Sequence, residues 1–178
     1  MKRRILSMLL VLMMLFTIMP TAAFADKSST DVVYNVESGK IYFNKSTGAI
    51  TDCDETVTAA DIPKEIEGVA VTSIGKQAFE FCKSLTSITL PNSVKSIGND
   101  AFRECSSLVS IKIPNSVTSI GDWAFGGCSS LTSINVASGN STYSSDNGVL
   151  FDKNKRIIIQ YPAGKRDASY VIPNSVKS

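Results

Sequence analysis

The sequence predicts a repeat solenoid, mainly β with short helical or 3₁₀ turns, in which one motif recurs at constant spacing. Ile-Gly pairs at 74–75, 97–98 and 120–121 are each followed, at fixed positions, by an Ala-Phe pair, a Cys, a Leu and an Ile. The segments 90–112 and 113–135 are identical at 15 of 23 positions. The positions that differ include Lys95/Thr118, Asp100/Trp123, Arg103/Gly126 and Glu104/Gly127. Repeats of this length must stack, because one coil cannot bury its own apolar face.

The segment 1–25 has the pattern of a secretory signal peptide. Three basic residues at 2–4 precede an apolar run over 5–19, and Ala-Phe-Ala at 23–25 forms a small-x-small cleavage site. An uncleaved membrane anchor is the alternative, but the run is shorter than the ~20 residues needed to span a bilayer. We therefore expect a secreted or cell-surface, extracellular protein, with no membrane insertion after signal cleavage.

Charge and composition exclude several function classes. The signal peptide holds three of the 18 Lys and Arg residues and none of the 16 Asp and Glu residues, so the mature chain has a net charge of about −1. A nucleic-acid partner is not expected, because phosphate binding needs a concentrated positive field. The chain has no histidine, which excludes Ser-His and Cys-His nucleophiles. We expect no enzyme activity, no cofactor and no metal site.

Residues 26–61 are expected to contain a disordered stretch and then a cap for the first coil. The polar residues 26–31 form the disordered stretch. The segments 33–43 and 49–57 alternate weakly and flank a turn-rich stretch at 44–48 that ends in Gly, which predicts a β-hairpin. A solenoid needs such a cap, because its terminal coil otherwise exposes an apolar edge.

Residues 62–136 contain three leucine-rich repeats of equal length. Each has a short strand, which reads Leu-Thr-Ser-Ile-Thr-Leu at 85–90 and recurs at 108–113 and 131–136. Alternation places the Ile and the last apolar residue of each strand inward. The outward residues are the candidate ligand-contact surface: Ser87, Thr89, Ser110, Lys112, Ser133 and Asn135. In the first two coils a Pro then ends ladder pairing, and the chain returns through a short helical or 3₁₀ turn around the Ala-Phe pair.

Residues 137–171 are expected to form an enlarged repeat. After Val136 the next apolar-Pro pair comes only at 172–173, well beyond the repeat spacing, so this coil carries an insertion. β-Rich runs at 148–151 and 156–161 flank a polar turn, which predicts a β-hairpin insertion. Residues 172–178 start a truncated further repeat, so we expect the sequence to be a fragment of a longer protein.

The four cysteines have three interpretations. Cys82, Cys105 and Cys128 occupy the same position of successive repeats, and Cys53 is off register. Four cysteines in an exported protein suggest disulfides, but equivalent residues of stacked coils lie about 4.8 Å apart, wider than the ~3.8 Å between bridged Cβ atoms. We therefore interpret them as buried thiols that pack as small hydrophobes. Metal binding is less favoured, because neither His nor CxxC spacing accompanies them.

The repeat resembles a known family. The motif I/L-P-N-S-V-x-S-I-G-x-x-A-F-x-x-C-x-S-L-x-S-I, at 90–111 and 113–134, is similar to the BspA-like bacterial leucine-rich repeats, also called the Treponema pallidum type. The resemblance covers residues 62–136 and resumes at 172, and the hairpin at 145–152 is similar to one inside such arrays. It implies a right-handed leucine-rich-repeat solenoid in a secreted or surface-exposed bacterial protein, without catalysis or cofactor. Some members are adhesins that bind extracellular matrix proteins, but no ligand residue carries over.

Two other groups of residues are given structural interpretations. The carboxylates of Asp52, Asp54 and Glu55 lie in an expected turn. A solvated acidic loop or a hydrogen-bonding network is favoured there over calcium, because the EF-hand ligand pattern is missing. We expect Trp123 to pack across to a neighbouring coil and Phe81 to cover the cap. The alternative is that these aromatic residues anchor a partner.

The leading functional hypothesis is an exported bacterial leucine-rich-repeat module for cell-surface adhesion or protein binding, whose partner is an extracellular protein or glycan. One alternative is the targeting segment of a larger surface enzyme that is truncated here. Another is a spacer that holds a further domain away from the cell wall.

Overall fold

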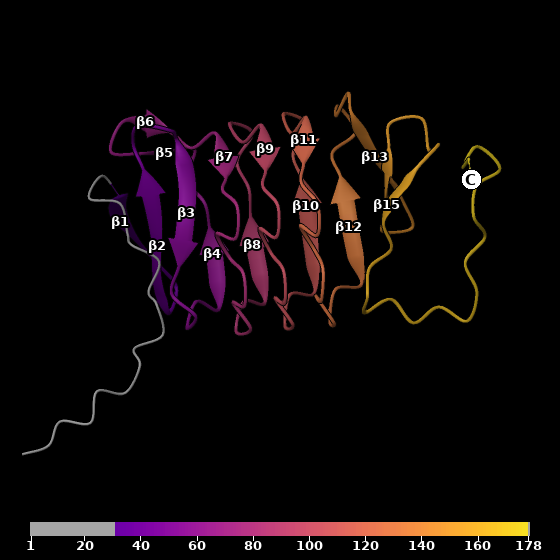
Figure 1. The fold of residues 1–178 in the computed structure, drawn as a ribbon, viewed down its shortest axis with the longest axis horizontal. Coiled ribbons are helices and arrows are strands. Elements are labelled where there is room, and N and C mark those ends of the chain that lie inside the picture. Colours follow the sequence, from indigo (N-terminus) through magenta and orange to yellow (C-terminus); the bar gives the residue numbers. More distant parts are fainter. Residues whose placement is uncertain (1–30, 178) are drawn as a thin grey trace, which may run out of the picture.

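The protein folds as an elongated stack of short β-strands in a computed structural model that describes residues 31–177 (Figure 1). Within this range the chain forms no helix, and so none that could span a membrane. The predicted β-solenoid is confirmed. The predicted signal peptide, residues 1–25, and the predicted disordered stretch up to residue 30 lie outside the described residues.

The strands are β1 (Asp31–Val36), β2 (Gly39–Asn44), β3 (Ala49–Cys53), β4 (Ala59–Asp61), β5 (Glu65–Ile66), β6 (Val69–Ala70), β7 (Ser73–Ile74), β8 (Ser87–Thr89), β9 (Ser96–Ile97), β10 (Ser110–Ile113), β11 (Ser119–Ile120), β12 (Ser133–Val136), β13 (Tyr143–Asp146), β14 (Val149–Asp152) and β15 (Ile158–Gln160).

The N-terminal cap is a three-stranded antiparallel meander, β1-β2-β3. The predicted hairpin turn at 44–48 is present between β2 and β3, with Gly48 at a φ of 69°. The single strand predicted over 33–43 is wrong, because the chain reverses between β1 and β2 at Ser38, whose φ is 63°. β3 then pairs in parallel with β7, β7 with β9, and β9 with β11. The cap and the coils therefore share one six-stranded sheet.

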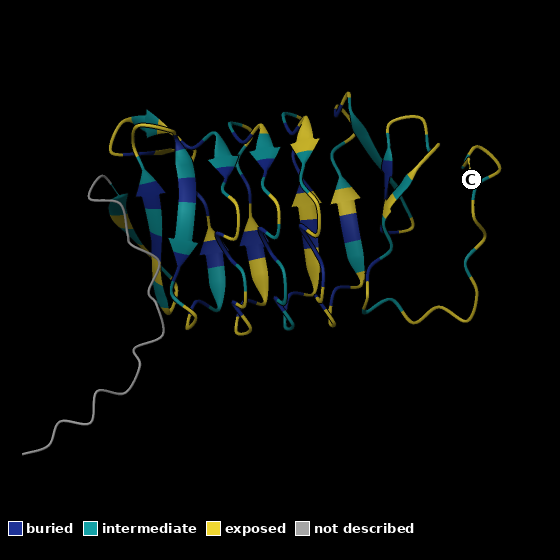
Figure 2. Ribbon diagram, in the orientation of Figure 1, coloured by how far each residue is buried: buried dark blue, intermediate teal, exposed yellow. Residues whose placement is uncertain are grey.

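A second row of strands consists of β4, β8, β10 and β12 (Figures 1 and 2). The last three carry the predicted alternation, and β4 extends the row on the side of the cap. β4 pairs in parallel with β8, and β10 with β12. Ser110 lies opposite Ser133 and Ile111 opposite Ile134, so equivalent repeat positions are in register. Both isoleucines are buried and Ser110 is exposed. The period-2 pattern thus divides core from surface as predicted.

The apolar residues of the repeat form columns through the stack. Phe79, Phe102 and Phe125 are stacked, with successive ring centroids 5.3 and 5.7 Å apart. All three side chains are buried. Burial of a side chain of this size stabilises the fold by roughly 1.5–3 kcal/mol, and an aromatic pair adds roughly 0.5–1.5 kcal/mol. The Leu column of the same coils is also buried.

The turns around the Ala-Phe pairs are not helical in the described residues. Alternate N–H groups of the first turn donate to the next coil: Gln77 to the Asn99 carbonyl at 3.0 Å and Phe79 to the Ala101 carbonyl at 2.8 Å. A helix would use these donors within its own turn, so the predicted helical or 3₁₀ turn is not formed. Each turn instead has two residues with positive φ: Gln77 and Phe81, Asp100 and Glu104, and Trp123 and Gly127.

The enlarged repeat contains the predicted hairpin and one additional strand. β14 and β15 form the hairpin, and β13 pairs antiparallel with β14 on its other side. Asn147 and Gly148 join β13 to β14 with φ values of 49° and 79°. Positive φ at both central residues is the type I′ geometry that Asn-Gly favours. The Ile134 N–H donates to the Gly148 carbonyl at 2.8 Å, which holds the insertion against β12.

Asn140 fastens the start of this insertion to the preceding coil. It is the buried polar residue of the described chain. Its Nδ2 donates to the carbonyls of Pro114 and Val117 at 2.8 and 2.9 Å, and its Oδ1 accepts from the N–H groups of Thr142 and Tyr143 at 2.8 and 2.7 Å. The side-chain amide is therefore fully satisfied.

Replacing Asn140 by Ala is expected to lower the free energy of unfolding by about 2 kcal/mol, because buried backbone groups lose their partners. Chemical denaturation measures the change. Asn135→Ala, at an exposed position of the neighbouring strand, is the control and should change stability by less than about 0.5 kcal/mol. Equal losses in the two variants would contradict the role assigned to Asn140.

Residues 172–177 lie beside the insertion. The Lys177 N–H donates to the Arg156 carbonyl at 2.9 Å, and the Ser175 hydroxyl to the Lys155 carbonyl at 2.8 Å. Ile172 is 55% exposed, whereas Ile113, at the equivalent apolar-Pro position, is fully buried between coils.

Candidate binding surfaces

The second row of strands presents the predicted contact residues on its outer face. Five of them are exposed: Ser87, Thr89, Ser110, Lys112 and Asn135. Ser133 is half-buried, because the insertion packs on it: a Cβ added at Gly148 would lie 2.8 Å from the Ser133 Cβ. The outer face is therefore accessible to solvent over β8 and β10, whereas the insertion covers part of it at β12.

A groove of about 510 Å³ opens beside this face, where β8, β10 and β12 end. Thr89 and Lys112 line it. Most of the other lining residues follow the strands: Pro91, Asn92, Pro114, Asn115, Ala137, Ser138 and Gly139. The structure thus brings two of the six candidate residues into a concave site and leaves the others on the flatter face.

The groove forms where the third coil departs from the repeat. Ala137-Ser138-Gly139 occupies the positions of Pro-Asn-Ser in the first two coils, and its small side chains leave space. Asn92 and Asn115 are exposed, and neither side chain has a hydrogen bond within residues 31–177. With the Lys112 ammonium, they offer amide donors, amide acceptors and one positive charge between proline surfaces. Sequence reasoning missed these asparagines, although the changed motif at 137–139 was the available signal.

The turns around the Ala-Phe pairs form one edge of the stack, here called the turn edge, which carries exposed aromatic residues. Trp123 is 73% exposed and Phe81 is 45% exposed. The expectation that Trp123 packs across to a neighbouring coil is wrong. Its φ is 56°, the left-handed conformation that Gln77 and Asp100 adopt at the same repeat position. Because these turn residues lie at the outer edge of the coil, the indole is left in solvent.

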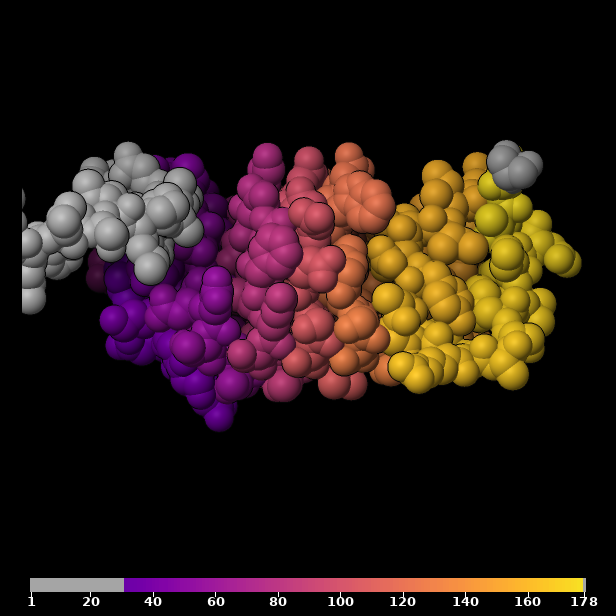
Figure 3. All heavy atoms as spheres, turned by 60° about the horizontal axis from the view of Figure 1, so that its bottom comes forward, coloured from indigo at the N-terminus to yellow at the C-terminus, as the bar shows by residue number. Residues whose placement is uncertain are grey.

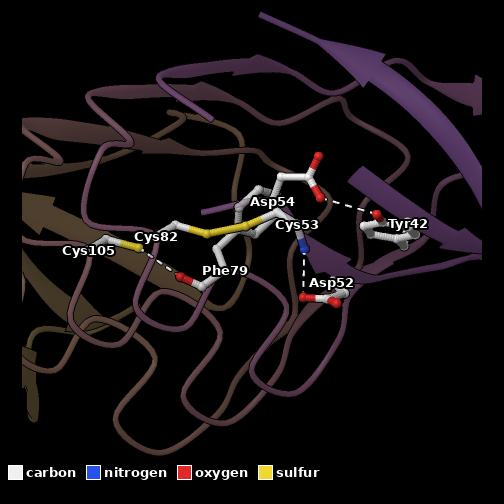
Figure 4. Close-up of a disulfide and its surroundings, with 7 residues drawn as sticks. All are labelled: Tyr42, Asp52, Cys53, Asp54, Phe79, Cys82 and Cys105. Atoms are coloured by element: carbon white, nitrogen blue, oxygen red, sulfur yellow. Dashed lines mark hydrogen bonds between the residues drawn. A yellow bond between two sulfur atoms is a disulfide. The ribbon is translucent and has the colours of Figure 1, made fainter. Parts of the chain in front are cut away.

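The acidic residues of the cap form local hydrogen bonds, one of the two expected arrangements. The predicted turn is wrong for Asp52, which lies in β3. The Tyr42 hydroxyl donates to Asp54 Oδ1 at 3.1 Å, and the Cys53 N–H donates to Asp52 Oδ1 at 2.8 Å (Figure 4). Across residues 31–177, no group of three or more Cys, Asp or Glu side chains is placed to hold a metal ion.

The repeat motif, the parallel strands in register and the stacked Phe column now have a counterpart among known families. The family model described as "BspA type Leucine rich repeat region (6 copies)" matches residues 56–148, just over half of the chain. The chain belongs to the BspA-type leucine-rich repeat family. No curated protein sequence matches it at a significant level.

A solved bacterial protein shares the fold of this BspA-type chain. The pneumococcal vaccine antigen PcpA has 32% identity and a TM-score of 0.63 over 68% of this chain and 29% of its own. A leucine-rich repeat protein from Bacteroides ovatus has 34% identity and a TM-score of 0.48, over 57% of this chain and 28% of its own. A leucine-rich cell surface protein from Faecalibacterium prausnitzii has 20% identity and a TM-score of 0.46, over 82% and 65%. The chain thus spans about three tenths of the length of PcpA.

A disulfide joins the cap of this BspA-type chain to its first coil. It links Cys53 at the end of β3 to Cys82 in the first turn (Figure 4). The interpretation of all four cysteines as thiols is therefore wrong for this pair. The spacing argument applied to equivalent residues of stacked coils, but Cys53 approaches Cys82 from the cap, outside the repeat register.

The two remaining cysteines are buried thiols, as predicted. The Cys105 thiol donates to the Phe79 carbonyl and the Cys128 thiol to the Phe102 carbonyl, both at 3.0 Å. The adjacent Cys128 side chain, together with burial, raises the pKa of Cys105 above its ordinary value. A neutral buried thiol reacts slowly, because the thiolate is the nucleophile.

Thiol titration is expected to find no reactive cysteine in the folded protein, two after denaturation and four after denaturation with reduction. The two are Cys105 and Cys128, and reduction releases the bridged pair. A thiol-specific chromophoric reagent counts them, and peptide mass mapping assigns them. Four thiols without reduction would contradict the bridge, and fast labelling of folded protein would contradict the burial.

Replacing Lys112 by Ala should change the free energy of unfolding by no more than about 0.5 kcal/mol, because its side chain is exposed. Denaturant titration of the purified variant measures this. A larger loss would mean that the lysine supports the fold, which would rule out its use as a probe of binding alone.

Proposed function

We propose that this chain is an exported bacterial binding module that acts at the cell surface and holds an extracellular protein or glycan in the groove at the ends of β8, β10 and β12. Adhesion is the role that this arrangement suits. The proposal includes no catalytic step, no cofactor, no nucleic-acid partner and no membrane insertion of the mature chain.

Export is supported by the sequence and by the disulfide. Residues 1–25 have the charge, apolar run and cleavage pattern of a signal peptide. Disulfides persist in oxidising compartments and are rare in the cytosol, so the Cys53–Cys82 bridge suits a protein outside the cell. Membership of the BspA-type family and similarity to a pneumococcal vaccine antigen agree with surface exposure.

The groove is the observation that carries the binding proposal. Solenoids expose a continuous face whose frame is constant and whose side chains vary. Here the face ends in a concave site that combines Lys112, the amides of Asn92 and Asn115, and two proline surfaces. Concave sites with a few polar groups among apolar walls are typical of ligand binding.

The test is binding of the purified protein to a panel of extracellular matrix proteins and mucins, repeated with Lys112→Glu. The charge reversal should weaken binding to the recognised ligand about tenfold or more, since it places a repulsive charge inside the groove. Lys95→Glu is the matched control, because Lys95 is also exposed but precedes β9 in the other row of strands.

Two results would contradict the proposal. A panel without any bound member would remove the binding role, and equal affinities of Lys112→Glu and Lys95→Glu for a bound member would place the contact elsewhere. Matrix proteins and mucins are both included in the panel so that a protein ligand and a glycan ligand are told apart.

A further inference from the structure

A second cavity, of about 320 Å³, opens on the turn edge between the second and third coils. Three repeat positions supply its lining, each from both coils: Asp100 and Trp123, Arg103 and Gly126, and Glu104 and Gly127. At all three positions the coils differ, although the two coils share most of their sequence. Three of the eight positions at which 90–112 and 113–135 differ therefore line one hollow of the surface. Figure 3 shows the successive coils as adjacent bands, from magenta to orange, on one face of the molecule.

Two glycines keep this hollow open. Gly127 has a φ of 71°, and a Cβ there would meet the Glu104 carboxylate. A Cβ at Gly126 would lie 3.0 Å from Cε3 of Trp123. Side chains at these positions would displace the carboxylate and the indole, so the third coil leaves space where the second coil has Arg103 and Glu104.

Two groups that face the hollow, the Trp123 indole and the Glu104 carboxylate, are available to bind a ligand. Trp123 is the chain's single tryptophan, is 73% exposed, and is held in a left-handed backbone conformation that bulky residues rarely adopt. The Glu104 carboxylate has no hydrogen-bond or ion-pair partner in the described part of the chain. An aromatic face and a free carboxylate thus lie together at the rim.

Between the first and second coils, an aromatic ring and a carboxylate already hold an arginine of the chain itself. There the guanidinium of Arg103 donates from Nη1 to Glu80 at 2.9 Å and lies 5.8 Å from the ring centroid of Phe81. Its Nε is also 3.9 Å from Asp100. The chain therefore fills the first gap with its own arginine, held by a carboxylate and an aromatic face. At the position of that arginine, the next coil has Gly126.

We propose that the hollow beside Trp123 binds an arginine side chain of a partner protein, with the guanidinium over the indole and hydrogen-bonded to Glu104. Trp provides the strongest cation–π face, and a carboxylate accepts two parallel bonds from a guanidinium. Lysine lacks the planar fork and should bind less tightly. The charge of Arg103 is offset by Glu80 and Asp100, so the guest meets an uncompensated negative charge at Glu104.

A neutral sugar ring fits these observations less well. It could stack on Trp123, but it would leave the Glu104 charge without a counterpart. The hollow is separate from the groove of the proposed function, because the two share no lining residue. This inference therefore stands or falls independently of the groove.

Intrinsic fluorescence tests the site directly, since Trp123 is the only indole in the protein. The probes are a glycine-flanked arginine pentapeptide, the same peptide with lysine, the same peptide with uncharged citrulline, and a neutral oligosaccharide. We expect a saturable change with the arginine peptide, a weaker response with lysine, and at least tenfold weaker binding of the citrulline peptide. Equal binding of arginine and citrulline peptides, saturation by the oligosaccharide alone, or no saturable response would overturn the proposal.

Two substitutions separate the site from general charge effects. Glu104→Gln keeps the side-chain shape and should weaken binding of the arginine peptide tenfold or more, whereas the control Glu65→Gln, at an exposed carboxylate of β5, should not change it. Gly126→Arg should place an arginine of the chain itself in the hollow and abolish the response to the peptide. Unchanged binding in both Glu104→Gln and Gly126→Arg would place the peptide elsewhere.

Discussion

Replacing Phe102 by Ala is expected to lower the free energy of unfolding by about 3–5 kcal/mol, the range for deleting a fully buried ring. Phe102 is the middle ring of the column and stacks on both Phe79 and Phe125. Its N–H also donates to the Ala124 carbonyl at 2.8 Å, so the backbone cannot easily collapse into the space left by the ring. Guanidinium unfolding followed by circular dichroism measures the loss.

Two further variants serve as comparisons for Phe102→Ala. Phe125→Ala removes a ring with one stacked neighbour in the column, so its free energy of unfolding should fall by less than that of Phe102→Ala. Val109→Ala, at a side chain that is 50% exposed in the same coil, should change stability by less than about 0.5 kcal/mol. A loss below about 1 kcal/mol for Phe102→Ala would mean that the rings are not in the stacked register, because a buried ring costs several times more to remove.

Removal of the Cys53–Cys82 bridge by Cys53→Ala is expected to lower the free energy of unfolding by about 3–4 kcal/mol. The bridged residues are 29 apart in sequence, and closing a loop of that length restricts the unfolded chain by about this amount. The freed Cys82 would remain as a buried thiol, as Cys105 and Cys128 already are. Denaturation with and without a reducing agent measures the contribution.

The reducing agent gives this experiment an internal control. The wild-type protein under reducing conditions should become as unstable as Cys53→Ala, and the variant itself should not respond to reduction. Cys128→Ala removes a buried thiol and leaves the bridge intact. Its loss of stability relative to wild type should therefore be the same with and without reductant. Equal stability of wild type and Cys53→Ala under oxidising conditions would contradict the conclusion that the Cys53–Cys82 bridge stabilises the packing of the cap on the first coil.

The stack could be predicted from sequence because its signals are local and repeated. The spacing of Ile74, Phe79 and Leu85 recurs in each coil, so one pattern determines the strands, the inward columns and the register of the coils. The outward direction of Thr89 and Lys112 followed from the same alternation, and both residues line the groove.

What could not be predicted depends on contacts between segments that differ. The bridge needs Cys53, which has no equivalent in the repeat, and its position depends on how the meander packs on the first coil. The non-helical turns depend on N–H groups that donate to the next coil, a contact that no single turn encodes. The exposure of Trp123 depends on a left-handed backbone that indole-bearing residues seldom adopt.

The left-handed turn residues also bear on how solenoids of this kind diversify. Gln77, Asp100 and Trp123 occupy one backbone position in three coils, and each has a φ between 56° and 60° where glycine would be less strained. In the first two coils the N–H of this residue donates to the next coil, from Gln77 to the Asn99 carbonyl at 3.0 Å and from Asp100 to the Asp122 carbonyl at 2.9 Å. The three coils carry an amide, a carboxylate and an indole at this position. One backbone conformation thus presents a different side-chain chemistry in each coil, which lets the surface of the stack vary while its frame repeats.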